Sequence, residues 1–95
     1  MLSVITSYPV AKGREREFEA TFAELQGRVI GQEPGTVGFQ LFASTEQRRN
    51  YKVIAHFRDQ AALDAHNSGR HLQALRTRLM AACDAAPTVE VFEAV

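Results

Sequence analysis

The sequence predicts an α+β fold in which strands and helices follow in the order β-α-β-β-α-β. Three observations lead to this prediction. Two stretches place apolar residues at helical spacing, four others alternate apolar and polar side chains or are rich in β-branched residues, and glycine, proline and polar residues separate them. Strands and helices in this order give an antiparallel four-stranded sheet with both helices on one face.

The first half of the chain supplies a strand, a helix and a second strand. Residues 2–10 are rich in β-branched residues and contain a proline near their end, where a strand ladder needs no donor. A helix is predicted next, ending near Gly31. Its apolar residues are spaced by four, three and four positions: Phe18, Phe22, Leu25 and Val29. The turn EPG at residues 33–35 then leads into an alternating strand, TVGFQLFAS at residues 36–44.

The second half begins after a short polar hairpin. Residues 51–58 alternate between two faces and are expected to pair antiparallel with the preceding strand. Asp59 is a good helix N-cap, because its carboxylate can accept backbone N–H groups of the first turn. A Ser-Gly break interrupts the helix, and Ser68 is predicted to cap a second helical stretch that ends at residues 86–87. The segment TVEVFEAV, residues 88–95, forms the last strand.

Length, charge and cysteine content limit the classes of function. At 95 residues the chain is expected to be one domain, residues 1–95, small enough to benefit from a partner subunit. Eleven basic and eleven acidic residues cancel, so neither nucleic acid nor an anionic membrane is expected as a partner. Without a membrane-spanning run or a signal peptide, the chain is expected to be soluble and cytoplasmic. The lone cysteine, Cys83, falls in an apolar helical row and is predicted to be an inert, buried thiol.

The second face of the predicted sheet is not uniformly polar. Ile5, Phe42 and Ile54 alternate with the residues that face the helices, so they lie on the face that the helices leave uncovered. Exposed apolar patches usually mark association surfaces. We therefore expect a symmetric homodimer built sheet against sheet.

The order of elements, the EPG turn and the run FRDQAALDAHNSGRH at residues 57–71 together resemble the antibiotic biosynthesis monooxygenase family. The resemblance covers essentially the whole chain. It implies a ferredoxin-like fold assembled into a dimeric α+β barrel, with a pocket between helices and sheet in each subunit. It also implies that a small phenolic or quinol substrate is oxidised there by molecular oxygen without a cofactor.

The chain departs from the family pattern at several positions. Many members carry a glutamate and a tryptophan in the third strand, where this chain has Ala55 and Phe57. The haem-degrading branch uses an asparagine, a tryptophan and a histidine at positions matching Thr6, His66 and Arg76. Without the axial histidine, haem binding is not expected. The missing glutamate motivates an alternative function, a non-catalytic dimeric module that binds a small hydrophobic ligand.

A cofactorless oxygenase needs a base, because a deprotonated phenol or quinol gives an electron to oxygen far more readily than the neutral substrate. His66 and His71 are the candidate catalytic residues, since histidine titrates near neutrality. Five positions apart on a helix they cannot chelate a metal as an i, i+4 pair does, so no metal site is predicted. If Ser68 caps the following helix, the helix dipole favours a neutral His71. The alternative is that both histidines are surface or capping residues.

The same pocket needs hydrogen-bond donors and aromatic walls. Thr6 and Tyr8, on the helix-facing side of the first strand, can donate to an oxyanion or else lie in solvent near the strand end. The candidate substrate-binding aromatic residues, which are alternatively core residues, are Phe22, Phe39, Tyr51 and Phe57. Arg70 and Arg76 can attract an anionic substrate or pair with glutamates. His56 is expected at the dimer interface or a sheet edge.

Overall fold

The computed structural model describes residues 1–95, apart from the side chain of His71. The elements are β1 (Leu2–Pro9), α1 (Glu15–Gln32), β2 (Thr36–Ala43), β3 (Asn50–Phe57), α2 (Gln60–Asn67), the short 3-10 helix η1 (Arg70–Leu72), α3 (Gln73–Ala81) and β4 (Thr88–Glu93). The predicted α+β fold is confirmed. The second helical region, however, is divided into three pieces, α2, η1 and α3.

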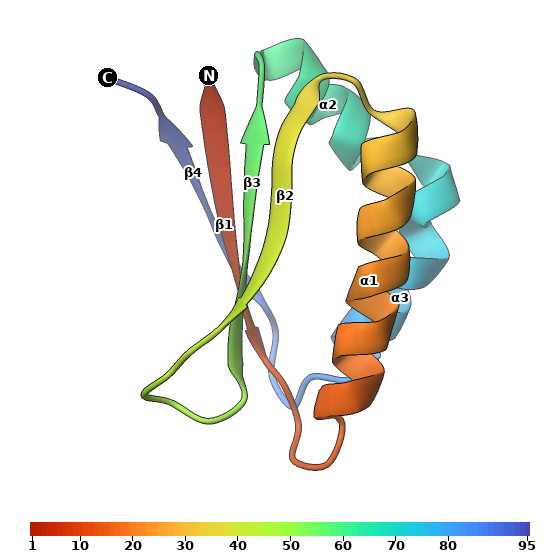
Figure 1. Ribbon diagram of the computed structural model, residues 1–95, viewed down its shortest axis with the longest axis vertical. Coiled ribbons are helices and arrows are strands. Elements are labelled where there is room, and N and C mark those ends of the chain that lie inside the picture. Colours follow the sequence, from red (N-terminus) through yellow and green to blue (C-terminus); the bar gives the residue numbers. More distant parts are fainter.

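The strands form one antiparallel sheet in the order β2-β3-β1-β4. The central strands β1 and β3 pair over their whole length, with Val4 opposite Ala55 and Ile5 opposite Ile54. All the helices lie on one side of this sheet, as Figure 1 shows. The protein therefore has two layers, with a helix-covered sheet face and an open one.

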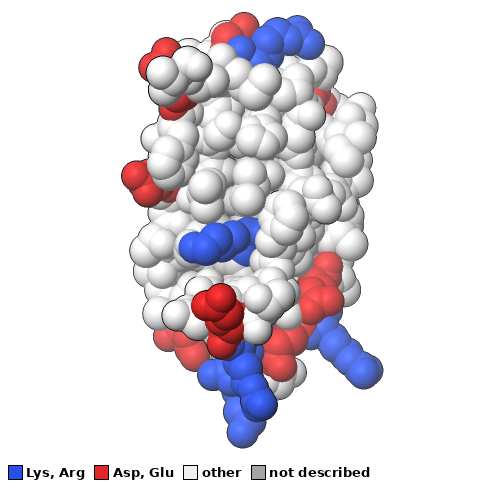
Figure 2. Space-filling model, turned by 60° about the vertical axis from the view of Figure 1, so that its left-hand side comes forward, with Lys and Arg blue, Asp and Glu red and all other residues white. Residues whose placement is uncertain are grey.

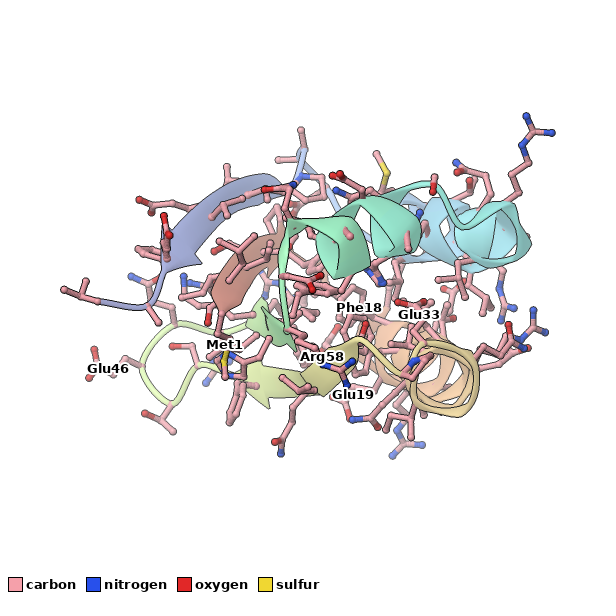
Figure 3. The ribbon with its side chains drawn as sticks, turned by 90° about the horizontal axis from the view of Figure 1, so that it is seen from above. Met1, Phe18, Glu19, Glu33, Glu46 and Arg58 are labelled. Atoms are coloured by element: carbon pink, nitrogen blue, oxygen red, sulfur yellow. The ribbon has the colours of Figure 1, made fainter. Side chains whose placement is uncertain are left out.

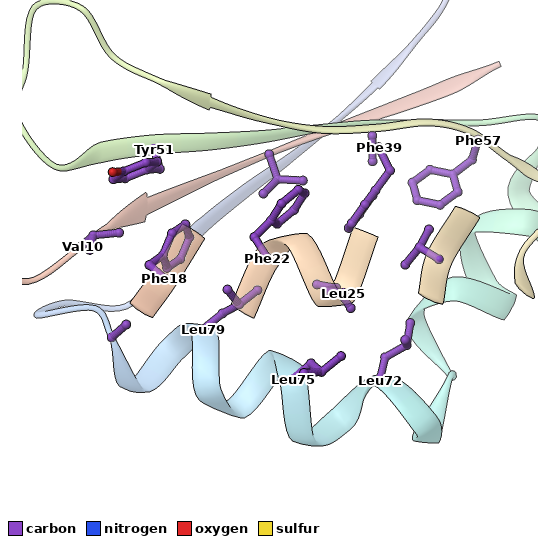
Figure 4. Packing of buried hydrophobic residues seen from close by; sticks show 14 of the residues in the cluster. Val10, Phe18, Phe22, Leu25, Phe39, Tyr51, Phe57, Leu72, Leu75 and Leu79 are labelled. Carbon is purple, nitrogen blue, oxygen red and sulfur yellow. The ribbon is translucent and has the colours of Figure 1, made fainter. Parts of the chain in front are cut away.

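The hydrophobic core lies between the two layers (Figure 4). The predicted apolar stripe of α1 is confirmed, because its members are almost completely buried: Phe18, Phe22, Leu25 and Val29. The ring of Phe18 packs between Tyr8 and Tyr51, with centroid distances of 5.2 and 5.1 Å. From α3, Leu75 and Leu79 close the core on its other side. No helix among the described residues is long and apolar enough to cross a membrane.

The turn between α1 and β2 docks on the beginning of α2. The backbone N–H of Arg58 donates to the carbonyl oxygen of Gly35 at 2.9 Å. A Cβ added at Gly35 would come within 2.6 Å of the Cβ of Ala62, so only glycine allows this approach. Asp59 caps α2 as predicted, because its carboxylate accepts from the backbone N–H of Ala62 at 2.9 Å. Residues 33–35 are thus held against the first turn of α2.

The predicted role of Ser68 is wrong. Its hydroxyl donates to the carbonyl oxygens of Asp64 at 2.9 Å and Ala65 at 3.3 Å, so Ser68 ends α2 instead of starting the next helix. A serine hydroxyl can satisfy backbone groups at either end of a helix, which the sequence alone does not distinguish. Gly69 precedes η1, and His71 lies in this 3-10 helix of three residues. The helix-dipole reason for a neutral His71 is therefore lost.

Cys83 lies beyond α3 and not in a helical row. The helix ends earlier than predicted because the chain turns to form a bridge between Cys83 and Val10. The thiol is half-buried and donates to the carbonyl oxygen of Leu79 at 3.4 Å. Burial raises the pKa of the Cys83 thiol, which disfavours the reactive thiolate. These contacts support the prediction of an inert thiol.

The open face of the sheet carries apolar groups between polar ones. Ile5 and Ile54 are half-buried neighbours, whereas Phe42 and Phe92 are 46% and 42% exposed. His56 belongs to this face in an interior strand, where its Nδ1 lies 2.6 Å from a serine hydroxyl of β1. Figure 2 shows a broad uncharged area on this side, crossed by one basic group, with most charged side chains toward the ends.

Candidate functional site

A cavity of about 390 Å³ lies between the helices and the covered face of the sheet. Most of its wall is apolar. The wall contains seven of the residues predicted from the sequence: Thr6, Tyr8, Phe22, Phe39, Phe57, His66 and Arg76. Met80 of α3 and Val89 of β4 also line it and are more than half exposed, so they mark its mouth.

Helix α2 places His66 in the wall of this cavity. Its imidazole lies between Phe39 and Phe57, with ring-centroid distances of 5.5 and 5.1 Å and interplanar angles of 59° and 50°. The Nδ1 atom lies 2.7 Å from Oε1 of Glu33. The two side chains are only 13% and 11% exposed, so this contact is shielded from solvent.

The protonation of His66 follows from these surroundings. Burial lowers the pKa of His66 below its ordinary value of 6.5, although the hydrogen bond and charge of Glu33 act in the opposite direction. The positive charge of Arg76 lowers this pKa further. The imidazole is therefore neutral at pH 7. A carboxylate only accepts hydrogen bonds, so the contact with Glu33 suits a hydrogen on Nδ1 of His66.

Tyr8 and Arg76 approach the same cavity from the sheet and from α3. Burial raises the pKa of Tyr8, so its hydroxyl stays protonated and able to donate. The guanidinium of Arg76 donates to the carbonyl oxygens of His66 and Asn67, which fixes it at the end of α2. Its charge acts on both Tyr8 and His66. Thr6 adds a second hydroxyl to the sheet side of the wall. The cavity thus combines a neutral acceptor, a cation and hydroxyl groups.

The profile of the antibiotic biosynthesis monooxygenase family matches residues 1–78. The chain belongs to this family. No curated protein sequence matches it significantly.

Solved structures share the fold over nearly the full chain. A candidate antibiotic biosynthesis monooxygenase from Caulobacter crescentus is 28% identical, with a TM-score of 0.94, covering 99% of this chain and 89% of that chain. Another antibiotic biosynthesis monooxygenase is 26% identical, with a TM-score of 0.88 and coverage of 100% and 99%. A mutant of SnoaB, a cofactor-independent oxygenase from Streptomyces nogalater, is 22% identical, with a TM-score of 0.85 and coverage of 98% and 91%. At that identity SnoaB shows the common fold alone.

One residue predicted for the site of this antibiotic biosynthesis monooxygenase family member falls elsewhere. Tyr51 does not line the cavity: it packs on Phe18, and its hydroxyl donates to Oε2 of Glu19 at 2.5 Å. Figure 4 shows Tyr51 at the opposite end of the core from Phe57. The side chain of His71 lies outside the described residues, so its catalytic role stays a prediction. Among the described side chains, no three histidine, cysteine, aspartate or glutamate residues are grouped to hold a metal ion.

Glu33 is the site residue that the sequence reasoning missed, because it was assigned only to a turn. Its Oε1 accepts from the hydroxyl of Thr36 at 2.9 Å and lies 2.7 Å from Nδ1 of His66. Figure 3 shows Glu33 between α1 and the α2–α3 segment. The joint occurrence of the EPG turn and the ALDAH run was the available signal. Local periodicity could not reveal the pair, since 33 positions separate the two residues.

Proposed function

We propose that the protein is a cofactor-independent monooxygenase that oxidises a small phenol or quinol with molecular oxygen in this cavity. The observation that carries the proposal is the neutral imidazole of His66, held by Glu33 in a wall of aromatic side chains. A neutral base in such surroundings can take a phenolic proton directly. Membership of the family supports the reaction class, and the oxygenase SnoaB has the same fold.

The size and shape of the cavity support a small aromatic substrate. A volume of about 390 Å³ lies toward the lower end of the range for small-molecule sites, roughly 300–1,000 Å³. Phe22 and Phe39 stack at 5.2 Å with an interplanar angle of 17°, which provides a flat apolar surface for a ring. We therefore propose a substrate that carries a phenolic hydroxyl and has either a single aromatic ring or two to three fused rings.

The proposed reaction begins when Nε2 of His66 takes the phenolic proton. Arg76 and Tyr8 stabilise the resulting phenolate by positive charge and a hydrogen bond. The phenolate gives one electron to dioxygen, and the phenoxyl radical and superoxide combine at a ring carbon that carries a hydrogen, para to the oxygen in a phenol and ortho to it in a 1,4-quinol. The imidazolium protonates the peroxide, the hydrogen on that carbon leaves as a proton, and the O–O bond breaks to release water. Phenol and dioxygen thus give a quinone and water without an external reductant.

The proposal is tested by oxygen uptake with a panel of hydroxylated naphthalenes, anthrones and quinols. We expect His66→Gln to lower kcat by about 100-fold or more, the usual contribution of a general base. His56→Gln is the matched control, since His56 lies on the other face of the sheet, and it should keep full activity. Circular dichroism and sedimentation establish that both variants remain folded and assembled as the wild type does. No uptake by folded wild-type protein across the panel, or equal activity in His66→Gln, would refute the function.

We also propose that the protein forms a homodimer through the open sheet face. Ile5 and Ile54 lie side by side on the two central strands, with the partly exposed rings of Phe42 and Phe92 on the edge strands. An apolar patch spread over all the strands of a sheet is typical of an association surface.

The alternative of a non-catalytic module was motivated by the missing carboxylate at Ala55. Because Glu33 brings a carboxylate to His66 from another element, no observation now favours that alternative.

A further inference from the structure

Two contacts join the α1–β2 turn to α2, and they are one helical turn apart. Gly35 lies against Ala62, and Glu33 reaches His66. Residues four positions apart share a face of a helix, so the turn touches the same face of α2 at both points. The geometry therefore couples the position of Glu33 to the position of the imidazole.

We propose that Glu33 is a positioning residue that holds the hydrogen of His66 on Nδ1, so that Nε2 faces the substrate as a proton acceptor. The chemical use of this arrangement rests on the proposed function. The tautomer itself does not, because it is a property of the protein without substrate. Glu33 does not line the cavity, so it acts through His66 and not on the substrate.

Two features of Glu33 suit this role. The hydroxyl of Thr36 donates to the same Oε1 that meets His66, which restricts the rotation of the carboxylate. The second oxygen, Oε2, is buried and has no hydrogen-bond partner among the described residues. A shielded carboxylate with spare acceptor capacity interacts more strongly once His66 becomes an imidazolium. Glu33 therefore both selects the tautomer and stabilises the protonated base during turnover, the role that the aspartate has toward histidine in serine protease triads.

The two charged groups that face His66 have opposite effects. Arg76 of α3, whose guanidinium lies at the end of α2, disfavours a positive imidazole, whereas Glu33 favours it. Burial between Phe39 and Phe57 keeps the resting imidazole neutral. In this arrangement His66 is uncharged before the substrate binds, and the carboxylate of Glu33 is already in place when His66 accepts a proton.

The decisive experiment is long-range ¹H–¹⁵N correlation NMR of the histidine side chains in the full chain at pH 7.5. We expect wild-type His66 to carry its hydrogen on Nδ1. In Glu33→Ala no acceptor remains for the hydrogen on Nδ1, so the hydrogen should move to Nε2 in more than half of the molecules. Glu24→Gln is the matched control, because Glu24 is an exposed α1 residue that pairs with Arg78, and it should leave the tautomer unchanged.

Thr36→Val gives a second, milder test, since it removes only the hydroxyl that anchors Oε1 of Glu33. It should shift the tautomer of His66 in the same direction by a smaller fraction. With an active substrate, Glu33→Ala should lower kcat by about 100-fold while KM changes little, because the substrate does not touch Glu33. A wild-type His66 with its hydrogen on Nε2, or a tautomer unaffected by Glu33→Ala, overturns the inference.

The two proposals fail separately. If wild-type His66 carries its hydrogen on Nδ1 but no phenol or quinol is oxidised, the role of Glu33 as a positioning residue stands and the oxygenase function fails. If a substrate is oxidised while the hydrogen lies on Nε2, the oxygenase function stands and the role of Glu33 fails.

Discussion

Replacing Gly35 by alanine is expected to separate the EPG turn from α2. The new Cβ would lie 2.6 Å from that of Ala62, whereas carbon atoms in contact are about 3.5–4.0 Å apart, so the turn must retreat by about 1 Å. A retreat of that size would lengthen the 2.7 Å contact between Glu33 and His66 to about 3.7 Å, beyond the range of a hydrogen bond. Local overpacking lowers the free energy of unfolding by about 1–3 kcal/mol. Alanine also reduces the conformational entropy of the unfolded chain relative to glycine, which raises the free energy of unfolding by about 0.4–1 kcal/mol. We expect a net loss of about 1–2 kcal/mol in the free energy of unfolding.

The assay is urea unfolding, combined with the NMR tautomer of His66. Ala62→Gly removes the methyl group that the new Cβ of Gly35→Ala would meet. The double variant should therefore be more stable than the sum of the single changes by at least about 1 kcal/mol, even though Ala62→Gly alone costs up to about 1 kcal/mol of helix propensity. Gly27→Ala is the matched control: it lies in α1 with open space around its Cβ and should stabilise the protein by up to about 1 kcal/mol.

Two results would refute this reasoning. One is a Gly35→Ala variant as stable as Gly27→Ala, with the hydrogen of His66 still on Nδ1. The other is strict additivity between Gly35→Ala and Ala62→Gly, which would show that the two positions do not press on each other.

Three further predictions concern the cap of α2, the pH dependence and the open face. Asp59→Ala should lower the free energy of unfolding by about 1 kcal/mol in urea, because the backbone N–H of Ala62 loses its acceptor. Burial lowers the pKa of His66 in the folded state, so the unfolded chain binds more protons, and the free energy of unfolding should fall as the pH drops below 6.5. His66→Gln should make the free energy of unfolding depend less on pH in this range, and an unchanged slope would contradict the prediction. Ile54→Asp should convert the proposed dimer to a monomer in sedimentation velocity, whereas Ile30→Asp, an exposed change on α1, should not.

Much of the fold could be predicted because its signals are local. The helical spacing of Phe18, Phe22, Leu25 and Val29 and the alternation around Val53 depend only on which face each element buries. The cap at Asp59 is also local, since its carboxylate reaches a backbone group three residues away. The same alternation places Thr6 on the covered side of β1, which is why it lines the cavity as expected.

The errors occur where one residue type serves two structural roles. Ser68 can cap either end of a helix, and only the position of the neighbouring carbonyl groups decides between them. Tyr51 shares a strand face with Phe57, but alternation does not say how far along the face a cavity extends. Its hydroxyl instead meets Glu19, near the start of α1.

In this site the carboxylate near the base comes from Glu33. The family pattern instead places a glutamate in the third strand, where this chain has Ala55. Ala55 lines the cavity, so an acidic side chain there would put a negative charge in the same space as the substrate and would oppose formation of a phenolate. Glu33 lies behind His66 and outside the cavity lining, where its charge meets the imidazole and not the substrate. With Ala55 the cavity wall stays mostly apolar, and burial dominates the pKa of His66. Among the described residues that line the wall, the cation Arg76 is the only charged group. Glu33 therefore places negative charge behind His66, and Arg76 places positive charge at the cavity. In the proposed reaction this arrangement would favour transfer of a proton from a phenol to Nε2.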